Sequence, residues 1–508
     1  MEVIAIFEFG KTNDEKQQSD SISQQKPDAK SNTKANDDGK NVSSKISEYE
    51  ALLKKIFFNS SDVIIDVFET QKDKAMIVYI DGLTDKDITD RDIIKPLKSP
   101  DFKGDIAYAI KARYKIVNDI SESVTEIVNG NVAVFYENSN EIFVVDFKQW
   151  DKRSVEPPDS ETVTRGPKEG FTENIRTNTV LIRRKIRNPA LIFENMTLGR
   201  QTNTQVSLVY VNGIVNQDVL KELKLRLSQI DVDSILESGH IEQFIDHNTF
   251  SPVSGVGVTQ KPDIAAARIL EGRVGVLCDG TPHVLTVPEL FIDNLHTSED
   301  YYSRTLQSTI IRMLRVIGLF IGTLLPGLSV AFMTYNPETI PPVFLTQLIN
   351  STQKTPLPAA AEAFFLILMF ELLRESGTRM PKTIGSAITI VGSLIIGEAA
   401  VNASIVGAPM VIIIALTAVS SFIVPSLAEF ILIYRLFFLL LGATMGLVGI
   451  GTGMVIMLAQ LISTESFGIP ILSSFSKNEM KDSVLRFPLW SMKSRPTSIV
   501  RNNVRKMK

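Results

Sequence analysis

Residues 436–462 read LFFLLLGATMGLVGIGTGMVIMLAQLI and contain no charged side chain. About 20 helical residues are enough to cross the hydrocarbon core of a bilayer, so this stretch predicts a membrane helix. The overall composition conceals it, because 44% hydrophobic and 22% charged residues with a net charge of −4 would suit a soluble protein. The mean hydropathy is only +0.10 because apolar segments are concentrated between Val316 and Ile462. The chain is therefore predicted to have a water-soluble N-terminal half and a membrane C-terminal half.

Apolar runs in the C-terminal half give five candidate membrane spans: Val316–Met333, Ala359–Leu373, Ile384–Ala408, Pro409–Ile433 and Leu436–Ile462. The second run is short enough for a re-entrant or interfacial segment. Arg304, Arg312 and Arg315 precede the first span, and Lys and Arg accumulate after the last, which predicts that both ends of the membrane half are cytoplasmic. Five crossings would place these ends on opposite sides. Either Ala359–Leu373 does not cross fully, or Leu436–Ile462 is not a single span.

Ionisable residues lie within or between the apolar runs: Glu362, Glu371, Glu398, Glu429 and Arg435. Arg435 separates the last two candidate spans and is predicted to lie on the cytoplasmic side. A charged side chain at bilayer depth costs about 2.5–3.5 kcal/mol on insertion scales, so such groups usually face a bundle interior or a water-filled path. The membrane half is therefore predicted to be functional as well as anchoring.

The segment Ile384–Ala408 is the predicted wall of a conduction path. It is rich in Gly, Ala and Ser, which permit close helix approach, and Glu398 and Asn402 share a helical face at four-residue spacing. Val391 and Leu394 are predicted to form an apolar constriction in the same path. The alternative is that Glu398 is buried, protonated or paired inside the bundle.

The soluble half contains two segments, 48–155 and 195–300, that resemble each other. Residues 76–83, MIVYIDGL, predict a strand that ends in a turn at Gly82. Residues 207–214, SLVYVNGI, repeat this pattern with the turn at Gly213, an offset of 131 residues. A β-hairpin pattern then begins at Gly130 and again at Gly272, an offset of 142, so the second copy has about 11 more residues between its landmarks. Coincidence is the alternative, but the landmarks recur in the same order. Two related α/β subdomains are therefore predicted, followed by an all-α multipass transmembrane bundle.

The remaining segments have distinct compositions. Residues 1–47 are mostly polar and are predicted to be a disordered cytoplasmic N-terminus, with the first helical face beginning near Ile46. Residues 156–194 form a predicted connecting segment, 301–465 the transmembrane domain with four or five membrane helices, and 466–508 a basic cytoplasmic tail. The opening residues MEVIAIFEFG lack a basic flank and are not expected to be a secretory signal, so the first membrane segment should direct insertion.

No pattern of residues predicts catalysis or metal binding. The segment 165–179 contains Gly-Pro-Lys-Glu-Gly but lacks the Gly-Lys-Ser/Thr end that cradles a phosphate. The single cysteine, Cys278, excludes an internal disulfide, and the four histidines lack metal-site spacing. The basic run at 182–187 could contact acidic lipid or nucleic acid, but a solvated helix face is favoured. We therefore expect no enzyme activity, no cofactor, no metal and no nucleic-acid partner.

Several blocks in the correct order resemble the A subunit of GerA-type spore germinant receptors. They are GPKEGFTENIRTN at 166–178, EGRVGV at 271–276, VPELF at 287–291, EDYY at 299–302, RMPKTIGS at 379–386 and GEAAV at 397–401. The resemblance covers nearly all of the chain beyond its N-terminal segment.

This resemblance implies a multipass protein of the inner membrane of Bacillus- or Clostridium-type endospores. It implies two partner subunits, a transporter-like, nutrient-binding B subunit and a lipoprotein C subunit. It also implies that the A subunit assembles as a homo-oligomer, a pentamer, and conducts monovalent cations when nutrient binds. In the family pattern, Gln is usual at position 398 and Glu at 402, whereas this chain has Glu398 and Asn402. The carboxylate is thus expected to have moved by one helical turn.

Two other classes of function remain open at this point. A secondary transporter would use broken helices and a substrate site at the membrane midplane, which Pro425 and the Gly-rich stretch 446–453 permit. Alternatively, the chain would be a non-conducting scaffold of the same receptor.

Overall fold

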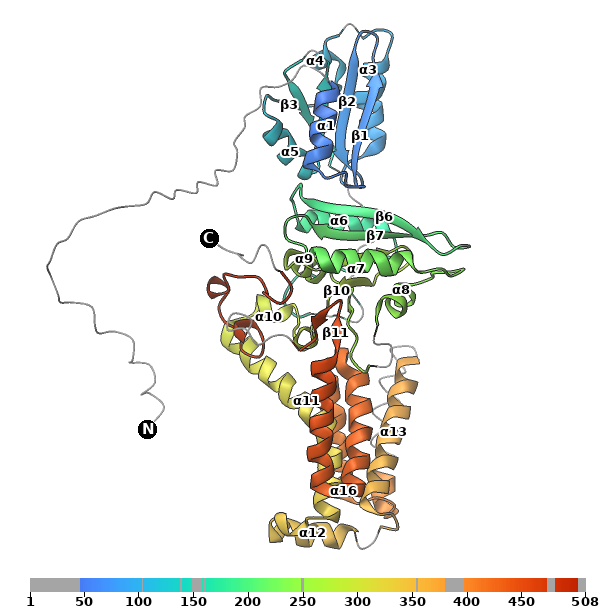
Figure 1. Cartoon of the computed structure of the whole chain (residues 1–508), viewed down its shortest axis with the longest axis vertical. Coiled ribbons are helices and arrows are strands. Elements are labelled where there is room, and N and C mark those ends of the chain that lie inside the picture. The colour runs from blue at the N-terminus through green and yellow to red at the C-terminus, as the bar shows by residue number, and fades with distance from the viewer. Residues whose placement is uncertain are drawn as a thin grey trace, which may run out of the picture. The chain divides into compact units, whose positions relative to one another are not determined.

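In the computed structural model, the described residues are 46–102, 104–137, 139–148, 158, 161, 163–247, 251–352, 355–379, 397–472 and 480–500. They form an N-terminal α/β region with two antiparallel sheets, followed by a region of apolar helices (Figure 1). The predicted fold class is confirmed in both parts. The predicted disordered segment 1–47 lies outside the described residues except for its last two positions.

The first sheet has the strand order β1-β2-β4-β5-β3, and all neighbouring strands are antiparallel. Helices α1 and α5 pack on one face through residues such as Leu53 and Ile127, and short helices cover the other face. The elements are α1 Ile46–Ile56, β1 Val63–Glu69, β2 Lys74–Ile80, α2 Lys86–Thr89, a π-helical turn Asp90–Ile94, α3 Lys95–Lys98, α4 Ile106–Ala109, β3 Tyr114–Val117, α5 Ile120–Val128, β4 Val132–Tyr136 and β5 Ile142–Val145.

The second sheet repeats this order as β6-β7-β9-β10-β8, again with antiparallel neighbours. Gly82 and Gly213 have φ angles of 79° and 80°, so both copies turn through the left-handed region that glycine tolerates best. β6 begins four residues before the predicted start of the second copy. The elements are α6 Ile175–Lys185, β6 Leu191–Leu198, β7 Thr204–Val211, α7 Gln217–Ser228, α8 Ser238–Ile245, β8 Gly257–Thr259, α9 Pro262–Leu270, β9 Val274–Cys278 and β10 Val284–Val287.

A buried ion pair joins the two subdomains. Arg183 of α6 donates from Nε and Nη2 to the two carboxylate oxygens of Asp62, both at 2.8 Å, and its side chain is 0% exposed. Beside it, the N–H of Ser61 donates to the carbonyl of Phe193 in β6 at 2.9 Å. Because an unpaired charge would be costly at this depth, the pair favours one fixed arrangement of the two sheets.

The C-terminal region contains long apolar helices, in which α11, α13 and α16 run side by side (Figure 1). Short 3₁₀ turns, α10 and the small hairpin β11–β12 connect this region to the rest of the chain. The elements are α10 Glu299–Tyr302, α11 Thr305–Thr334, α12 Pro342–Thr352, α13 Ala359–Arg379, a helical segment at 397–402, α15 Ala408–Phe422, α16 Ala428–Ser463, β11 Glu465–Ser466 and β12 Ile469–Pro470.

α16 reverses direction at Gly446. The hydroxyl of Tyr434 donates to Oε1 of Gln460 at 2.7 Å, although 26 residues of straight helix would separate them by about 39 Å. Gly446 has non-helical backbone angles, φ 60° and ψ −141°, that only glycine adopts readily. The hydroxyl of Tyr335 lies within 2.9 and 2.8 Å of the carbonyl oxygens of Ala443 and Thr444, which end the first arm. Leu436–Ile462 is therefore not one span but parts of two antiparallel arms.

The break between α15 and α16 also differs from the sequence prediction. α15 ends at Phe422 and a 3₁₀ turn occupies Pro425–Leu427, so residues 428–433 belong to α16 and not to the preceding span. The predicted boundary at Arg435 was wrong, because proline interrupts the helix ten residues earlier whereas arginine continues it.

Candidate functional site

Arg435 occupies the interior of the helical region. Its Nε donates to the carbonyl oxygen of Gly322 in α11 at 2.9 Å, and its side chain is 1% exposed. Pro326, four residues after Gly322, has no N–H and so leaves this carbonyl without its helical partner. Arg435 thus supplies the donor that Pro326 removes.

The same guanidinium group connects two further helices. Nη1 of Arg435 lies 3.4 Å from Oε1 of Glu371 in α13, and Nη2 lies 3.5 Å from the carbonyl oxygen of Thr417 in α15. Arg374 contacts the other carboxylate oxygen of Glu371 at 2.8 Å. The prediction that Arg435 lies at a break between two spans was therefore wrong, since α16 continues through it and its side chain is buried and paired within the bundle. Sequence spacing could not reveal partners that lie 64 and 113 residues away.

Glu362 is also compensated inside the bundle. Its Oε2 accepts a hydrogen bond from the N–H of Gly407 at 3.2 Å, at the N-terminus of α15. A carboxylate is favourable there, because helix N-termini carry unpaired N–H groups and partial positive charge. Oε1 of Glu362 is buried and has no hydrogen-bond partner within the described part of the chain.

Glu398 and Asn402 contrast with these buried groups. Both side chains are exposed on the isolated chain, in the helical segment 397–402, where four-residue spacing puts them on one face. No described residue forms an ion pair with Glu398. Val391 and Leu394 lie outside the described residues, so their predicted role stays a prediction. Glu429 is exposed in the first turn of α16.

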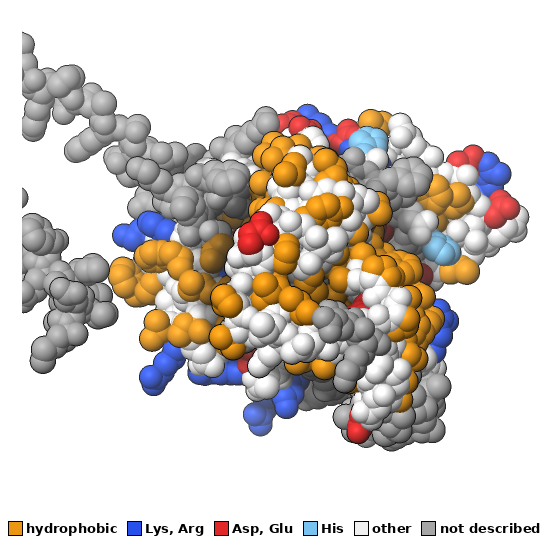
Figure 2. Space-filling view, turned by 90° about the horizontal axis from the view of Figure 1, so that it is seen from below, with side chains coloured by type: hydrophobic (Ala, Val, Ile, Leu, Met, Phe, Trp, Pro, Cys, Tyr) orange, Lys and Arg blue, Asp and Glu red, His pale blue; other side chains and the backbone are white. Residues whose placement is uncertain are grey.

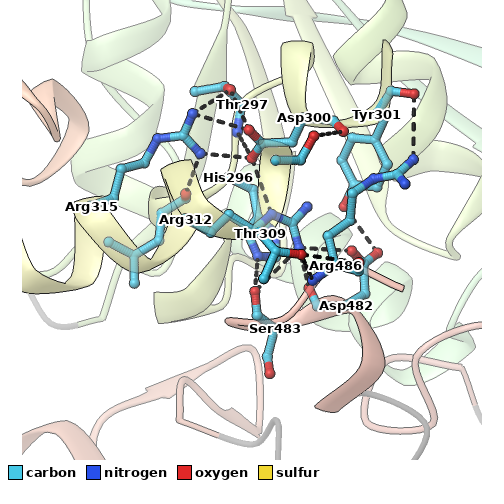
Figure 3. A network of polar contacts seen from close by, with 12 residues as sticks. His296, Thr297, Asp300, Tyr301, Thr309, Arg312, Arg315, Asp482, Ser483 and Arg486 are labelled. Carbon is cyan, nitrogen blue, oxygen red and sulfur yellow. Dashed lines mark hydrogen bonds and ion pairs between the residues drawn. The ribbon is translucent and has the colours of Figure 1, made fainter. Parts of the chain in front are cut away.

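A second cluster of charges lies where α10 meets α11 (Figure 3). Arg315 donates from Nη1 and Nη2 to the two carboxylate oxygens of Asp300 at 2.7 and 3.1 Å, and Nε of Arg312 donates to the same group at 3.1 Å. Burial alone would raise the pKa of Asp300, but its hydrogen bonds and the positive charges of Arg315 and Arg312 lower this pKa below its ordinary value. Arg312 also binds Asp482 at 2.9 Å, in the stretch 480–500 that is called the C-terminal segment below.

This junction network was missed by sequence reasoning, which used Arg312 and Arg315 only as signals of membrane orientation. It also contains His296, whose Nε2 donates to the carbonyl of Ser483 at 2.8 Å (Figure 3). Burial and the positive charge of Arg312 lower the pKa of His296. Nη1 of Arg486 donates to the hydroxyl of Thr305 at 3.0 Å, which ties the C-terminal segment to the first turn of α11.

Among the residues that the structure describes, no group of three or more His, Cys, Asp or Glu side chains could hold a metal ion. The strongly interacting charges are paired with one another, as in the junction network and around Arg435.

These features define a class of protein: an α/β region joined through a buried ion-pair network to apolar helices that contain internal charges. Thr305–Thr334 is long and apolar enough to cross a membrane, and so is Pro425–Ser463, although the latter contains the reversal at Gly446. Hydrophobic side chains are spread over much of the described part of the face seen in Figure 2, and Lys and Arg lie toward its margin. Membrane association is the property that these helices suggest.

The chain belongs to the GerA family, described as "Bacillus/Clostridium GerA spore germination protein", which matches residues 51–498. It is 39% identical to spore germination protein KA of Bacillus subtilis over 90% of this chain and 87% of that protein. It is 40% identical to the uncharacterized membrane protein YfkQ of the same organism, over 76% of each chain. The predicted resemblance is thereby confirmed, and neither of these names describes an enzyme.

A solved structure also matches the chain. The crystal structure of the N-terminal domain of the A subunit of the Bacillus megaterium spore germinant receptor GerK3 is 32% identical, with a TM-score of 0.39. The match covers 49% of this chain and 97% of that one.

Proposed function

We propose that this protein is the A subunit of a nutrient germinant receptor and that it forms an oligomeric channel for monovalent cations in the inner membrane of the endospore. Family membership supports a role in spore germination. The proposed partners are further copies of this chain, pentameric in number, and the B and C subunits of the receptor. The α/β region and the C-terminal tail would lie on the cytoplasmic side.

The reversal at Gly446 supports this orientation. The two arms of α16, 428–445 and 447–463, add two antiparallel passages to those of α11, α13 and α15. The predicted span Ile384–Ala408, which the structure describes from residue 397 onward, would make six. An even number returns the chain to the side from which it started, which removes the conflict between five crossings and two basic ends.

The exposure of Glu398 is the observation that carries the channel proposal. Inside the bundle, Glu362, Glu371 and Arg435 each have a partner, whereas Glu398 presents its carboxylate to the outside of the single chain. An ionised group at membrane depth requires water or a neighbouring subunit. A ring of such carboxylates from identical subunits would attract cations and repel anions. Val391 and Leu394 would narrow the same path.

Spores that carry Glu398→Gln test the proposal. Cation release after addition of nutrient should be several-fold slower, because the substitution removes the charge and keeps the shape. The matched control is Glu338→Gln, at an exposed carboxylate in the 3₁₀ turn after α11, which should release cations at the normal rate. Immunoblots and cross-linking must show normal amounts of assembled protein. Normal cation release from Glu398→Gln spores would contradict the proposal.

A secondary transporter is the second candidate, because charged side chains buried among membrane helices, here Glu371 and Arg435, often mark a substrate or ion pathway. Purified receptor in liposomes distinguishes the two, since a channel passes ions much faster than any alternating cycle. A scaffold would show no flux with any combination of nutrient and partner subunits.

A further inference from the structure

The N-terminal turns of α11 extend beyond the length that a membrane requires. Thr305–Thr334 has 30 residues and is therefore about 45 Å long, whereas the hydrocarbon core of a bilayer is about 30 Å thick. The excess of about 15 Å corresponds to roughly ten residues, 305–314. Since the predicted span starts at Val316, these turns would lie at the depth of the lipid headgroups.

One face of these turns is apolar and exposed. Leu306, Ile310, Met313, Leu314 and Ile317 follow the spacing of a single helical stripe, and Leu306 is 74% exposed. The opposite face holds Arg312 and Arg315 in the buried junction network. The same turns thus pack against protein on one side and leave an apolar surface on the other.

The C-terminal segment adds a second apolar and aromatic surface beside this stripe. Leu485, Phe487, Leu489 and Trp490 are all exposed, and Trp490 is 74% exposed. Between Leu485 and Phe487, the buried Arg486 points inward: its N–H donates to Oγ1 of Thr309 at 3.2 Å. Exposed and buried side chains therefore alternate here, so that the segment packs on α11 while its apolar side chains face outward.

The segment is fixed at both ends. Asp482 binds Arg312 at its start, and Ile499 and Val500 are buried in the core of the second sheet at its end. A segment held in this way loses little further conformational entropy when its outer side chains bind a partner.

The charges around this surface favour one kind of partner. Arg304 and Lys493 are exposed, whereas Asp482, the one acidic residue within 480–500, is turned inward to Arg312. Basic residues near a membrane surface gain about 1 kcal/mol each from anionic lipids. Tryptophan is enriched at the boundary between headgroups and acyl chains.

We propose that residues 485–493 and the outer face of the first turns of α11 form a membrane anchor that lies in the headgroup zone of an anionic phospholipid bilayer. The inference rests on the membrane placement of α11 in the proposed function, but not on ion conduction. It assigns the C-terminal segment a role in fixing the depth and orientation of α11, next to the junction network.

The chain carries its own reporter for this proposal, because Trp150 and Trp490 are its two tryptophans. The full-length variant Trp150→Phe, reconstituted in vesicles of phosphatidylcholine and phosphatidylglycerol, leaves Trp490 as the single fluorophore. Lipids brominated near the headgroup end of their acyl chains should quench its emission, and aqueous acrylamide should quench it weakly. The matched control places tryptophan at Tyr108, which is 90% exposed in the first subdomain, in a Trp150→Phe/Trp490→Phe background. This control should show the reverse.

Two results would overturn the anchor, and a third would overturn its preference for anionic lipid. Quenching by acrylamide alone would place Trp490 in water, and quenching by neither agent would place it against another copy of this chain or another subunit. Equal bromine quenching in pure phosphatidylcholine would overturn the preference for anionic lipid. Extraction with alkaline carbonate separates failure of the anchor from failure of the membrane placement: a chain that stays in the membrane pellet while Trp490 remains in water contradicts the anchor alone.

Discussion

Replacing Arg183 by Met should loosen the contact between the two α/β subdomains. The guanidinium of Arg183 is 0% exposed and Asp62 is 7% exposed, so the substitution leaves a buried carboxylate without its counter-charge. Removing one partner of a buried ion pair costs about 3–5 kcal/mol. The carbonyl groups of Asn188 and Leu191, which accept from Arg183 at 3.0 Å, lose a donor as well.

Hydrogen exchange of the full-length protein in detergent measures this loss directly. The amide N–H of Ser61 donates to the carbonyl of Phe193 at 2.9 Å, and the N–H of Phe193 donates to Oγ of Ser60 at 2.9 Å. Both amides therefore report opening of the contact. A loss of about 3 kcal/mol should speed their exchange by about 150-fold, since each 1.4 kcal/mol is a factor of ten.

The control is Arg200→Met, which removes an exposed partner of Asp231 (62% and 69% exposed) and should change exchange by less than about fivefold. Adding Asp62→Asn to Arg183→Met should recover part of the loss, because it removes the unpaired charge and lets Ser60 keep its hydrogen bond. If Arg183→Met changes exchange no more than the control does, the pair does not hold the subdomains together and the reasoning is refuted.

Three further outcomes are expected. Gly446→Ala should destabilise the detergent-solubilised protein by about 1–3 kcal/mol in thermal denaturation, because φ is +60° at this position. The control Gly451→Ala should be neutral or stabilising, because an added Cβ meets nothing within 4 Å there. Equal effects of the two substitutions would argue against the reversal. Arg435→Met should lower the free energy of unfolding by about 3 kcal/mol and reduce the yield of folded protein. Arg379→Met, which removes an exposed ion pair, should do neither. Equal yields of the two variants would contradict the interior role of Arg435. The lowered pKa of His296 means that the unfolded chain binds a proton more readily than the folded one, so stability should fall as the pH drops below about 6.5. The melting temperature of His296→Gln should depend less on pH in this range. An unchanged pH dependence in this variant would contradict the assignment.

Local patterns predicted the α/β region well. The hairpin expected from Gly130 is β4–β5, and the one expected from Gly272 is β9–β10. The helical face near Ile46 is α1. Alternation and turn residues suffice for such elements because the interacting residues are close in sequence. The common strand order of the two sheets supports the duplication inferred from the landmark offsets.

Contacts over long sequence separations were not predictable in the same way. Arg435 was predicted to mark a boundary because charge usually ends a membrane span. The carbonyl that accepts from it lacks a helical donor because of a proline that lies more than 100 residues earlier. The reversal at Gly446 interrupts no apolar pattern, since both arms are hydrophobic and only the glycine-rich composition marks the turn. Glu398 and Asn402 share a helical segment as predicted, and whether they face a pore stays a prediction.

The reversal potential of the assembled receptor in a planar bilayer, measured across a gradient of potassium chloride while nutrient is present, tests the central claim most directly. If the carboxylate of Glu398 faces a water-filled path between identical subunits, the potential should lie close to the potassium equilibrium value and should move toward zero in Glu398→Gln. A current that is anion-selective, or a reversal potential that is identical in the two proteins, would contradict the account.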